Sequence, residues 1–340
     1  MMRWLITGGC GFMGSNFIRY WLKNHTEDYI LNLDKLTYAG NPDNLKMIEN
    51  HPHYRFVLGD IIDPQAIESL VPEFDGIINF AAETHVDRSI AQPRDFILTD
   101  MVGTYNLLEA ARFHQKKLIQ ISTDEVYGNC PSGQNTEHAP LLPGNPYSAS
   151  KGGADLLCLA YHQTYKVDVM ITRSCNCYGP YQYPEKLIPL FITNLLEGKK
   201  LPLYGDGSCI REWIYIQDYC SALDIVIQKG KTGEIYNIST GEGLPNLEVT
   251  RLILQEMGMS EDFIEKVDDR QGHDRRYSLD ASQIRQLGWN PEYSFSMGLK
   301  ETLQWYRHND NWWRKIKSGE YQEYYRQQYA QRLKKSTLER

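Results

Sequence analysis

The stretch RWLITGGCGFMGSNF, residues 3–17, decides the fold. Its first half is an apolar run of strand length, and its second half carries Gly9-x-Gly11-x-x-Gly14 where a helix is expected to begin. Counted from Gly8, the same residues also form Gly-x-x-Gly-x-x-Gly. Glycines at such a turn let the backbone approach a pyrophosphate, which then lies at the amino end of the following helix. The stretch therefore predicts a dinucleotide-binding fold.

Asp34 ends the next apolar run, YILNLD, and stands 20 residues after Gly14. A carboxylate there accepts a hydrogen bond from the 2′-hydroxyl of an adenosine ribose and repels a 2′-phosphate. NAD is therefore expected rather than NADP, and the neighbouring Lys35 is the feature that argues the other way. Asp60 follows the third run and is expected to hold the adenine amino group, unless it serves only as a helix cap.

Apolar runs of strand length alternate with helical patterns along the first half of the chain. The runs lie at 3–8, 29–34, 54–60, 76–82, 117–123 and 167–174, and the helical patterns lie at 14–24, 64–70, 93–113 and 147–165. Such alternation predicts an α/β protein with a Rossmann-like, doubly wound parallel sheet. Small residues at the end of the fourth run, Phe80-Ala81-Ala82, are then expected where the dinucleotide passes.

Beyond about residue 175 the chain changes to short elements and turn signals, with helical stretches near 186–197, 247–257, 281–287 and 296–308. This change predicts a smaller α+β substrate-binding lobe. The expected division is a NAD-binding domain at 1–178, a substrate lobe at 179–316 and a C-terminal helical tail at 317–340. Residues 217–239 are expected to return to the main sheet.

Charge and cysteine content exclude several classes of function. The chain has 36 basic and 43 acidic residues, a net charge of −7 and no long basic run, which argues against a nucleic-acid or membrane-surface partner. Its seven cysteines form no CxxC pair or metal-like cluster, and no segment reaches the roughly twenty apolar residues of a membrane helix. The beginning of the sequence lacks the pattern of a signal peptide. A reduced, cytoplasmic protein without a metal site is expected.

A hydroxyl residue and a Tyr-x-x-x-Lys pair carry the clearest chemistry. Thr123 ends the fifth run, and Tyr147 and Lys151 follow on a helical pattern. Positions i and i+4 share a helix face, so the lysine is expected to lower the pKa of the phenol and to bind a ribose. The phenolate then serves as a base near neutral pH.

Seven stretches together carry a resemblance: LTYAGN (36–41), ETHVDRSI (83–90), STDEVYG (122–128), PYSASK (146–151), NCYGPYQYPEKLIP (176–189), GDGSCIREWIY (205–215) and RQGHDRRYSLD (270–280). They resemble the extended short-chain dehydrogenase/reductases, and within that family the 4,6-dehydratases that act on dTDP-glucose. The resemblance spans roughly residues 3–308. It implies NAD as the cofactor, a nucleotide sugar (dTDP-glucose) as the substrate and a homodimer as the assembly.

The resemblance also assigns roles to the adjacent acids Asp124 and Glu125. An epimerase expels no water, whereas a dehydratase must remove a proton from C5 of the sugar and protonate the departing C6 hydroxyl. Two neighbouring carboxyl groups can do both if one stays protonated while the other is ionised. Asp124 is implied as the acid at the C6 hydroxyl and Glu125 as the base at C5, while Tyr147, with Thr123 and Lys151, takes the proton of the C4 hydroxyl.

Further residues are implied as contacts of the two ligands. The cofactor contacts are Gly8, Gly11, Phe12, Met13, Gly14, Asp34, Lys35, Leu36, Thr37, Asp60, Ile61, Phe80, Ala81, Ala82, Thr99, Tyr147, Lys151 and Cys177. The substrate contacts are Thr84, Thr123, Asn176, Lys186, Leu187, Pro202, Leu203, Tyr204, Arg211, Asn246, Arg270 and His273. Among the latter, a guanidinium such as that of Arg211 can grip phosphate oxygens at two places.

Two positions depart from the family pattern, and several alternatives stay open. Cys177 stands where an asparagine is usual at the nicotinamide end, and a thiol does not replace the hydrogen bonds of an amide. Gln271 replaces a usual proline. The alternative functions are a 4,6-dehydratase for a UDP- or GDP-hexose, a UDP-sugar 4-epimerase, and a scaffold without turnover. The homodimer is expected to pair segments 93–113 and 147–165 of each subunit, unless both are buried within one subunit.

Overall fold

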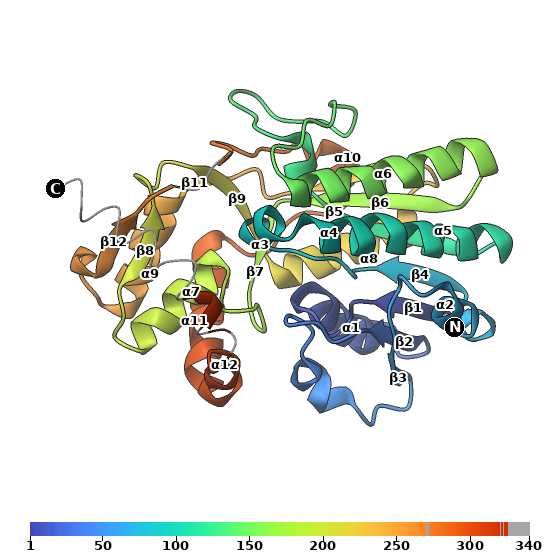
Figure 1. Ribbon diagram of the computed structural model, residues 1–340, viewed down its shortest axis with the longest axis horizontal. Coiled ribbons are helices and arrows are strands. Elements are labelled where there is room, and N and C mark those ends of the chain that lie inside the picture. Colours follow the sequence, from blue (N-terminus) through green and yellow to red (C-terminus); the bar gives the residue numbers. More distant parts are fainter. Residues whose placement is uncertain (270–271, 320, 322, 326–340) are drawn as a thin grey trace.

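Seven parallel strands form the main sheet of the protein (Figure 1). The computed structural model describes residues 1–269, 272–319, 321 and 323–325. In the order in which they lie side by side, the strands are β10 (Ile235–Ile238), β6 (Val169–Ser174), β5 (Lys117–Thr123), β4 (Gly76–Asn79), β1 (Arg3–Thr7), β2 (Tyr29–Asp34) and β3 (Tyr54–Leu58). The strand order reverses next to β1, which is the arrangement of a doubly wound sheet. The expected Rossmann-like fold is therefore confirmed.

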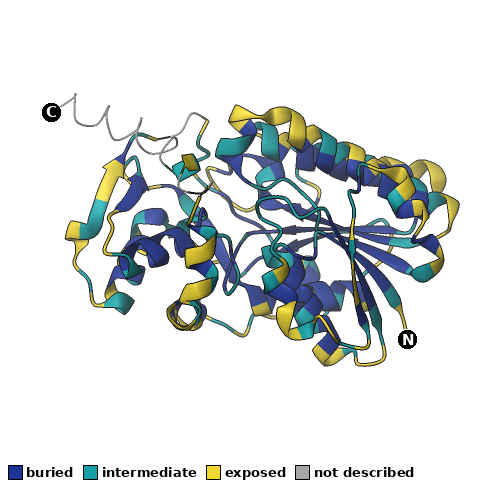
Figure 2. Ribbon diagram, turned by 60° about the horizontal axis from the view of Figure 1, so that its bottom comes forward, coloured by how far each residue is buried: buried dark blue, intermediate teal, exposed yellow. Residues whose placement is uncertain are grey.

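Helices cover both faces of the main sheet. They do so because the strands carry apolar side chains on both faces. Leu5 of β1 packs in one cluster, with residues of α2 (Pro64–Glu68), α5 (Thr104–Phe113) and α6 (Pro146–Tyr165). Its neighbours Trp4 and Ile6 pack in the other cluster, with residues of α1 (Phe12–Asn24) and α8 (Ile216–Lys229). Successive strand residues point to opposite faces, so each strand serves both layers. Figure 2 shows the buried strands between helices that are exposed on their outer sides.

The segment 93–113, expected to be one helix, is divided into three parts. α4 (Pro93–Phe96) follows α3 (Val86–Ala91), then a π-helical turn spans Ile97–Gly103, and α5 completes the segment. A π-helical turn shifts the following residues around the helix axis and is frequent at functional sites. Here it buries Thr99 and Asp100 next to the carboxyl edge of the sheet.

A second group of elements lies at one end of the main sheet (Figure 1). It contains a three-stranded sheet and a strand pair that the sequence did not predict. The strands are β7 (Asn176–Tyr178), β9 (Ile210–Tyr215), β11 (Gly243–Pro245), β8 (Leu201–Tyr204) and β12 (Ile264–Val267). The helices are α7 (Leu187–Leu196), α9 (Asn246–Met257), α11 (Phe295–His308) and α12 (Asp310–Ile316). α10 (Ser282–Gln286) instead packs on β10 of the main sheet.

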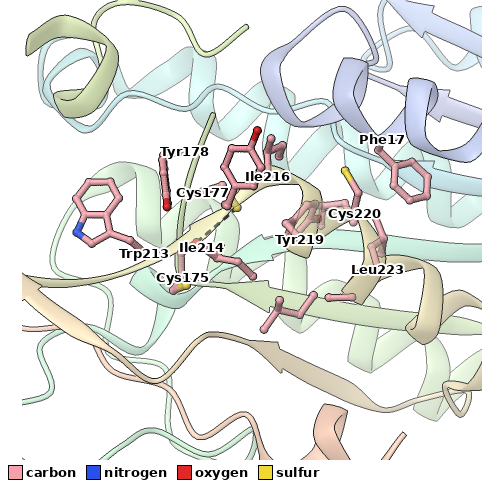
Figure 3. Packing of buried hydrophobic residues seen from close by; sticks show 14 of the residues in the cluster. Phe17, Cys175, Cys177, Tyr178, Trp213, Ile214, Ile216, Tyr219, Cys220 and Leu223 are labelled. Carbon is pink, nitrogen blue, oxygen red and sulfur yellow. Dashed lines mark hydrogen bonds between the residues drawn. The ribbon is translucent and has the colours of Figure 1, made fainter. Parts of the chain in front are cut away.

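One apolar core joins the two groups. Figure 3 shows Tyr178 and Cys177 of β7 and Trp213 of β9 beside Tyr219 and Cys220 of α8. Because α8 also packs against α1, the second group is anchored to the layer that carries the glycine loop. Residues 217–239 lie within α8 and β10, and β10 pairs with β6 in the main sheet. Among the described helices, none has the length and apolar character needed to cross a membrane.

Candidate active site

A pocket lies at the carboxyl edge of the main sheet and is lined by the turns that follow β1 to β7. Ligands of open α/β sheets bind at this edge, beside the point where the strand order reverses. Every residue expected to contact the cofactor lines the pocket except Leu36. Eleven other residues line it that the sequence did not single out: Leu33, Ala39, Gly40, Gly59, Ile121, Ser122, Ser174, Cys175, Gln182, Tyr183 and Glu185.

The glycine loop between β1 and α1 is shaped for close backbone approach. Gly8 has φ +68°, and a Cβ atom there would lie 2.5 Å from the backbone nitrogen of Ala81. At Gly14 a Cβ atom would lie 2.6 Å from the carbonyl oxygen of Gly8. Neither position accepts a side chain, and the free N–H groups of the first turn of α1 remain available for a diphosphate. The pocket therefore fits a dinucleotide with its pyrophosphate at Gly11–Gly14.

Asp34 is held rigidly at the end of β2. Its two carboxylate oxygens accept hydrogen bonds from the backbone N–H groups of Cys10 and Leu36, each at 2.8 Å. Leu36 thus orients Asp34 from behind the pocket wall. Lys35 turns away to Thr99, whose hydroxyl lies 3.0 Å from its Nζ, and toward the carboxylate of Asp60 at 3.6 Å. Its charge is already engaged, so Asp34 is the residue that decides which ribose fits.

Tyr147 and Lys151 lie on α6, with the expected spacing of one turn. The Lys151 ammonium donates to the backbone oxygen of Ile121 at 2.6 Å, at the end of β5. The expected lowering of the phenol pKa is wrong for the protein without ligands: burial, the Glu125 carboxylate and the Asp100 carboxylate raise the pKa of Tyr147 well above its ordinary value. A hydrogen bond with Thr123 acts in the opposite direction. Lys151 can be paired with Tyr147 from the sequence spacing, whereas only the fold brings the carboxylates of Asp100 and Glu125 near the phenol.

Asp124 and Glu125 follow β5 in a tight turn whose first N–H groups are capped by Thr123. The Thr123 hydroxyl accepts from the Glu125 N–H at 3.3 Å and lies 3.1 Å from Asp124 Oδ1. Burial and the neighbouring Glu125 carboxylate raise the pKa of Asp124 well above its usual range. Within the described part of the chain, Asp124 Oδ2 and Glu125 Oε2 are buried without a hydrogen-bond partner, although both residues line the pocket. Two such oxygens fit a ligand that offers hydroxyl groups.

The residues expected to contact the substrate fall into two sets. Thr84, Thr123, Asn176 and Lys186 line the pocket. Those that are described but do not line it are Leu187, Pro202, Leu203, Tyr204, Arg211, Asn246 and His273. Arg270, like Gln271, lies outside the described residues. Among the described residues, Asn176 Oδ1 and Asn246 Oδ1 are further buried oxygens without a partner.

Arg211 is buried and occupied by protein groups. Its guanidinium donates to the backbone oxygens of Ile210 and Asp274, both at 2.8 Å, and lies 4.1 Å above the ring of Tyr277. It also lowers the pKa of Asp124 by its charge, though burial outweighs this effect. A contact with phosphate needs donors beyond the two that are engaged, and a guanidinium has five. This contact stays a prediction.

His273 lies in a polar cluster with Cys209 and Asp269. Its Nδ1 is 3.5 Å from Cys209 Sγ and 2.6 Å from Asp269 Oδ1. The three ligand-type atoms lie within 4.8 Å of one another, but the charge of Arg211 acts on the same thiol and opposes a cation. No metal is assigned to this cluster.

Cys177 lines the pocket where an asparagine is usual. Its Sγ lies 3.9 Å from Ser174 Oγ and 3.7 Å from the backbone oxygen of Cys175, and burial raises its thiol pKa to about 12. A thiol with this pKa stays protonated at neutral pH and is a weak nucleophile. The departure therefore changes hydrogen bonding at the pocket wall rather than adding a reactive group.

Comparisons with known proteins agree with this geometry. The family model described as GDP-mannose 4,6 dehydratase matches residues 5–302. The chain is 52% identical to the low-salt glycan biosynthesis protein Agl12 of Haloferax volcanii, over 90% of this chain and 99% of that protein. It is 48% identical to the dTDP-glucose 4,6-dehydratase of Streptomyces niveus, over 93% of this chain and 96% of that enzyme.

A solved structure is similar to this chain in fold as well as in sequence. The dTDP-glucose 4,6-dehydratase DesIV of Streptomyces venezuelae, with NAD and TYD bound, is 49% identical and superposes with a TM-score of 0.91 over 93% of this chain and 100% of that one. The chain therefore belongs to the 4,6-dehydratase family of the GDP-mannose 4,6 dehydratase model, and the relatives it is similar to include dTDP-glucose 4,6-dehydratases.

Proposed function

We infer that this chain is a dTDP-glucose 4,6-dehydratase, a hydro-lyase that uses NAD. It oxidises C4 of the sugar, eliminates water across C5 and C6, and returns the hydride to C6, giving dTDP-4-keto-6-deoxy-glucose and water. The observation that carries the inference is the buried Asp124 and the half-buried Glu125 in the same pocket as Tyr147, with one unpartnered carboxyl oxygen on each acid in the described structure. An enzyme that only oxidised and reduced C4 would have no use for this pair.

The cofactor supplies one kind of chemistry: bound NAD accepts the C4 hydride and gives it back at C6. The protein residues move the protons. Tyr147 acts as a phenolate: it must first lose its own proton to water, against the raised pKa of the buried phenol, and the positive charge of Lys151 favours that loss. The phenolate then takes the proton of the C4 hydroxyl, so C4 becomes a ketone that acidifies the hydrogen on C5. Glu125 removes that C5 proton, and Asp124 gives its proton to the C6 hydroxyl, which leaves as water.

The proton balance closes over one turnover. The proton on Glu125 exchanges with water, and Glu125 then gives a proton to C5 when C6 receives the hydride. Tyr147 then holds one proton too many and Asp124 one too few, and exchange through water restores both. Asp124 suits the acid role because burial and the Glu125 carboxylate raise its pKa, so its carboxyl stays protonated where an ordinary aspartate would be ionised.

Product identification with several nucleotide sugars tests the function directly. The purified chain is incubated with dTDP-glucose, UDP-glucose and GDP-mannose, and each mixture is examined for a 4-keto product that absorbs in alkali. We expect this product from dTDP-glucose. A keto product from another nucleotide only would change the substrate, and a 4-epimer without a keto product would identify an epimerase.

The substitution Glu125→Gln tests the elimination. It preserves the shape of the side chain but cannot accept the C5 proton, so product formation is expected to fall by about 10²–10⁴-fold. Turnover in deuterium oxide should place deuterium at C5 of the product of the wild type. Equal rates for the two proteins would remove Glu125 from the proposed role.

We also propose that the enzyme works in the cytoplasm and forms a homodimer. All seven cysteines are buried free thiols, which suits the reducing cytoplasm. A homodimer through segments 93–113 and 147–165 is supported by apolar side chains that the single subunit leaves exposed on them: Ile97, Val102, Tyr105, Phe113, Leu156 and Tyr165.

A further inference from the structure

Asp100 is a fully buried acid directly behind the active-site wall. It lies in the π-helical turn Ile97–Gly103, is 1% exposed, and does not line the pocket. Its Oδ1 accepts the backbone N–H of Glu83 at 3.0 Å, and its Oδ2 lies 2.6 Å from the hydroxyl of Ser150. The mechanism gives this carboxyl group nothing to do.

These two contacts connect Asp100 with both sides of the reaction site. Ser150 precedes Lys151 on α6, and its hydroxyl also lies 2.8 Å from the backbone oxygen of Tyr147. Glu83 precedes Thr84, which lines the pocket. A carboxylate that binds both segments fixes the distance between the Tyr147 turn of α6 and the loop after β4.

On the basis of the proposed function, we propose that Asp100 is a positioning residue whose buried negative charge also opposes the release of the Tyr147 proton and thereby sets the pH range in which C4 is oxidised.

The charges around Asp100 support this role. From α6, the Lys151 ammonium attracts it and the Tyr147 phenol faces it; from the loop after β4, Glu83 repels it. Lys35 lies one step further out, bound to the hydroxyl of Thr99 and 3.8 Å from the Glu83 carboxylate. Since Asp100 is buried, these interactions are weakly screened.

The protonation of Asp100 falls within the working pH range. Burial raises its pKa to about 6, against the lowering effect of Lys151 and Ser150. The negative charge is therefore present at neutral pH and is lost as the pH falls below about 6. Its presence is one cause of the raised pKa of Tyr147.

Asp100→Asn is the deciding variant, because an amide has the same shape and no charge. The readout is the first half of the reaction, the appearance of reduced nicotinamide in a single turnover of the NAD-loaded enzyme with dTDP-glucose, across pH. In a plot of this rate against pH, the acid limb is the part over which the rate falls as the pH drops. We expect this limb to move to lower pH by about one unit in the variant, the usual size of the effect when a neighbouring like charge is removed. The KM for dTDP-glucose should change less than twofold.

Two further variants make the test specific. Ser150→Ala keeps the acid and its charge, because a pKa of about 6 leaves Asp100 ionised wherever the more weakly acidic Tyr147 titrates. It removes only the hydrogen bond to α6, so the rate is expected to fall while the acid limb stays in place. Asp95→Asn removes an equal charge from an exposed position in the same segment, where solvent screens it, and should leave the limb unmoved.

The outcomes separate this proposal from the function on which it rests. If the wild type makes no 4-keto product, the function fails. If it does, and the folded Asp100→Asn enzyme keeps the acid limb of the wild type, Asp100 is structural only. Should Asp100→Asn not fold, Asp100→Ser, which also removes the charge, takes its place: a limb that stays in place or moves to higher pH overturns the proposal.

Discussion

At the scale of single residues, the site separates two adjacent acids by their surroundings. Asp124 is enclosed and faces Glu125, which raises its pKa, whereas hydrogen bonding to Thr123 and the charge of Arg211 only partly offset this. A carboxyl group can donate a proton only while it is protonated. It loses that proton when the pH rises above the raised pKa that it has in the folded protein. The elimination should therefore slow on the alkaline side for want of a protonated Asp124.

Asp124→Asn removes this acid without changing its shape. Oxidation at C4 depends on Tyr147 and should proceed, while loss of the C6 hydroxyl should slow by about 10²–10⁴-fold. Rapid mixing with dTDP-glucose should then show reduced nicotinamide that accumulates and decays slowly. Decay at the wild-type rate would mean that another group protonates the hydroxyl.

Gly8→Ala tests the glycine loop against a matched control. Gly8 and Gly133 have nearly the same φ, +68° and +69°, so alanine meets similar backbone strain, about 1–2 kcal/mol, at both. Only at Gly8 would the new Cβ collide with backbone, at 2.5 Å from Ala81; at Gly133 it meets nothing within 4 Å. Calorimetric titration with NAD should show at least tenfold weaker binding for Gly8→Ala and unchanged binding for Gly133→Ala. Equal affinities in both variants would contradict the close-approach argument.

At the scale of elements, the strands of the main sheet were predictable and those of the second group were not. β5 has the expected bounds, 117–123, because Leu118, Ile119 and Ile121 mark it as a strand that is buried along nearly its whole length. β7 and β11 have three residues each and owe their pairing to β9, so no local pattern marks them. The π-helical turn could not be predicted either. The sequence 93–113 favours a helix, and only tertiary packing changes the hydrogen-bond pattern of part of it from α to π.

The candidate site was predictable to the extent that it lies at the ends of strands. The glycine loop, Asp34 and the Thr123 turn follow buried runs, and the parallel sheet brings such ends together. The residues of the second group are placed by long-range packing, so their distances from the pocket were not predictable. Burial and the Glu125 carboxylate are the main causes of the raised pKa of Tyr147, and Asp100, which nothing in the local sequence links to Tyr147, adds to them.

A buried ion pair joins α6 to β6, and its removal should weaken the sheet beneath the site. Asp155 Oδ2 accepts from Arg173 Nε at 2.8 Å and from the Ser122 hydroxyl at 2.9 Å, and both charged side chains are at most 2% exposed. Asp155→Ala leaves the Arg173 charge buried alone, so the free energy of unfolding in urea should fall by about 3–5 kcal/mol.

Two comparisons check that burial causes this loss. Replacing both partners, Asp155→Leu with Arg173→Met, should restore much of the stability because no uncompensated charge remains. Glu261→Gln breaks the exposed pair with Arg251 and should lower the unfolding free energy by less than about 1 kcal/mol. Similar losses at the buried and the exposed pair would show that desolvation is not the cause.

At the scale of the whole molecule, the exposed apolar side chains of 93–113 and 147–165 mark one outer layer of the main sheet. Leu156 is 56% exposed, Ile97 50% and Phe113 66%, although each belongs to a helical segment that packs on the sheet. Exposed apolar side chains on one layer support the proposed homodimer. A two-fold dimer would place each patch against its own copy, which buries the two segments of both subunits together.

Leu156→Arg is expected to convert the dimer to a monomer. The substitution introduces a charge where two copies of α6 would meet, and a symmetric contact places that charge opposite itself. Light scattering coupled to size exclusion should report half the mass of the wild type at micromolar concentration. Met47→Arg is the matched control, because Met47 is 87% exposed but lies outside both segments, next to α1, and should leave the mass unchanged. Because α6 also carries Tyr147 and Lys151, the monomer should have a lower kcat as well as a lower mass, and a wild type that is already monomeric would refute the interface.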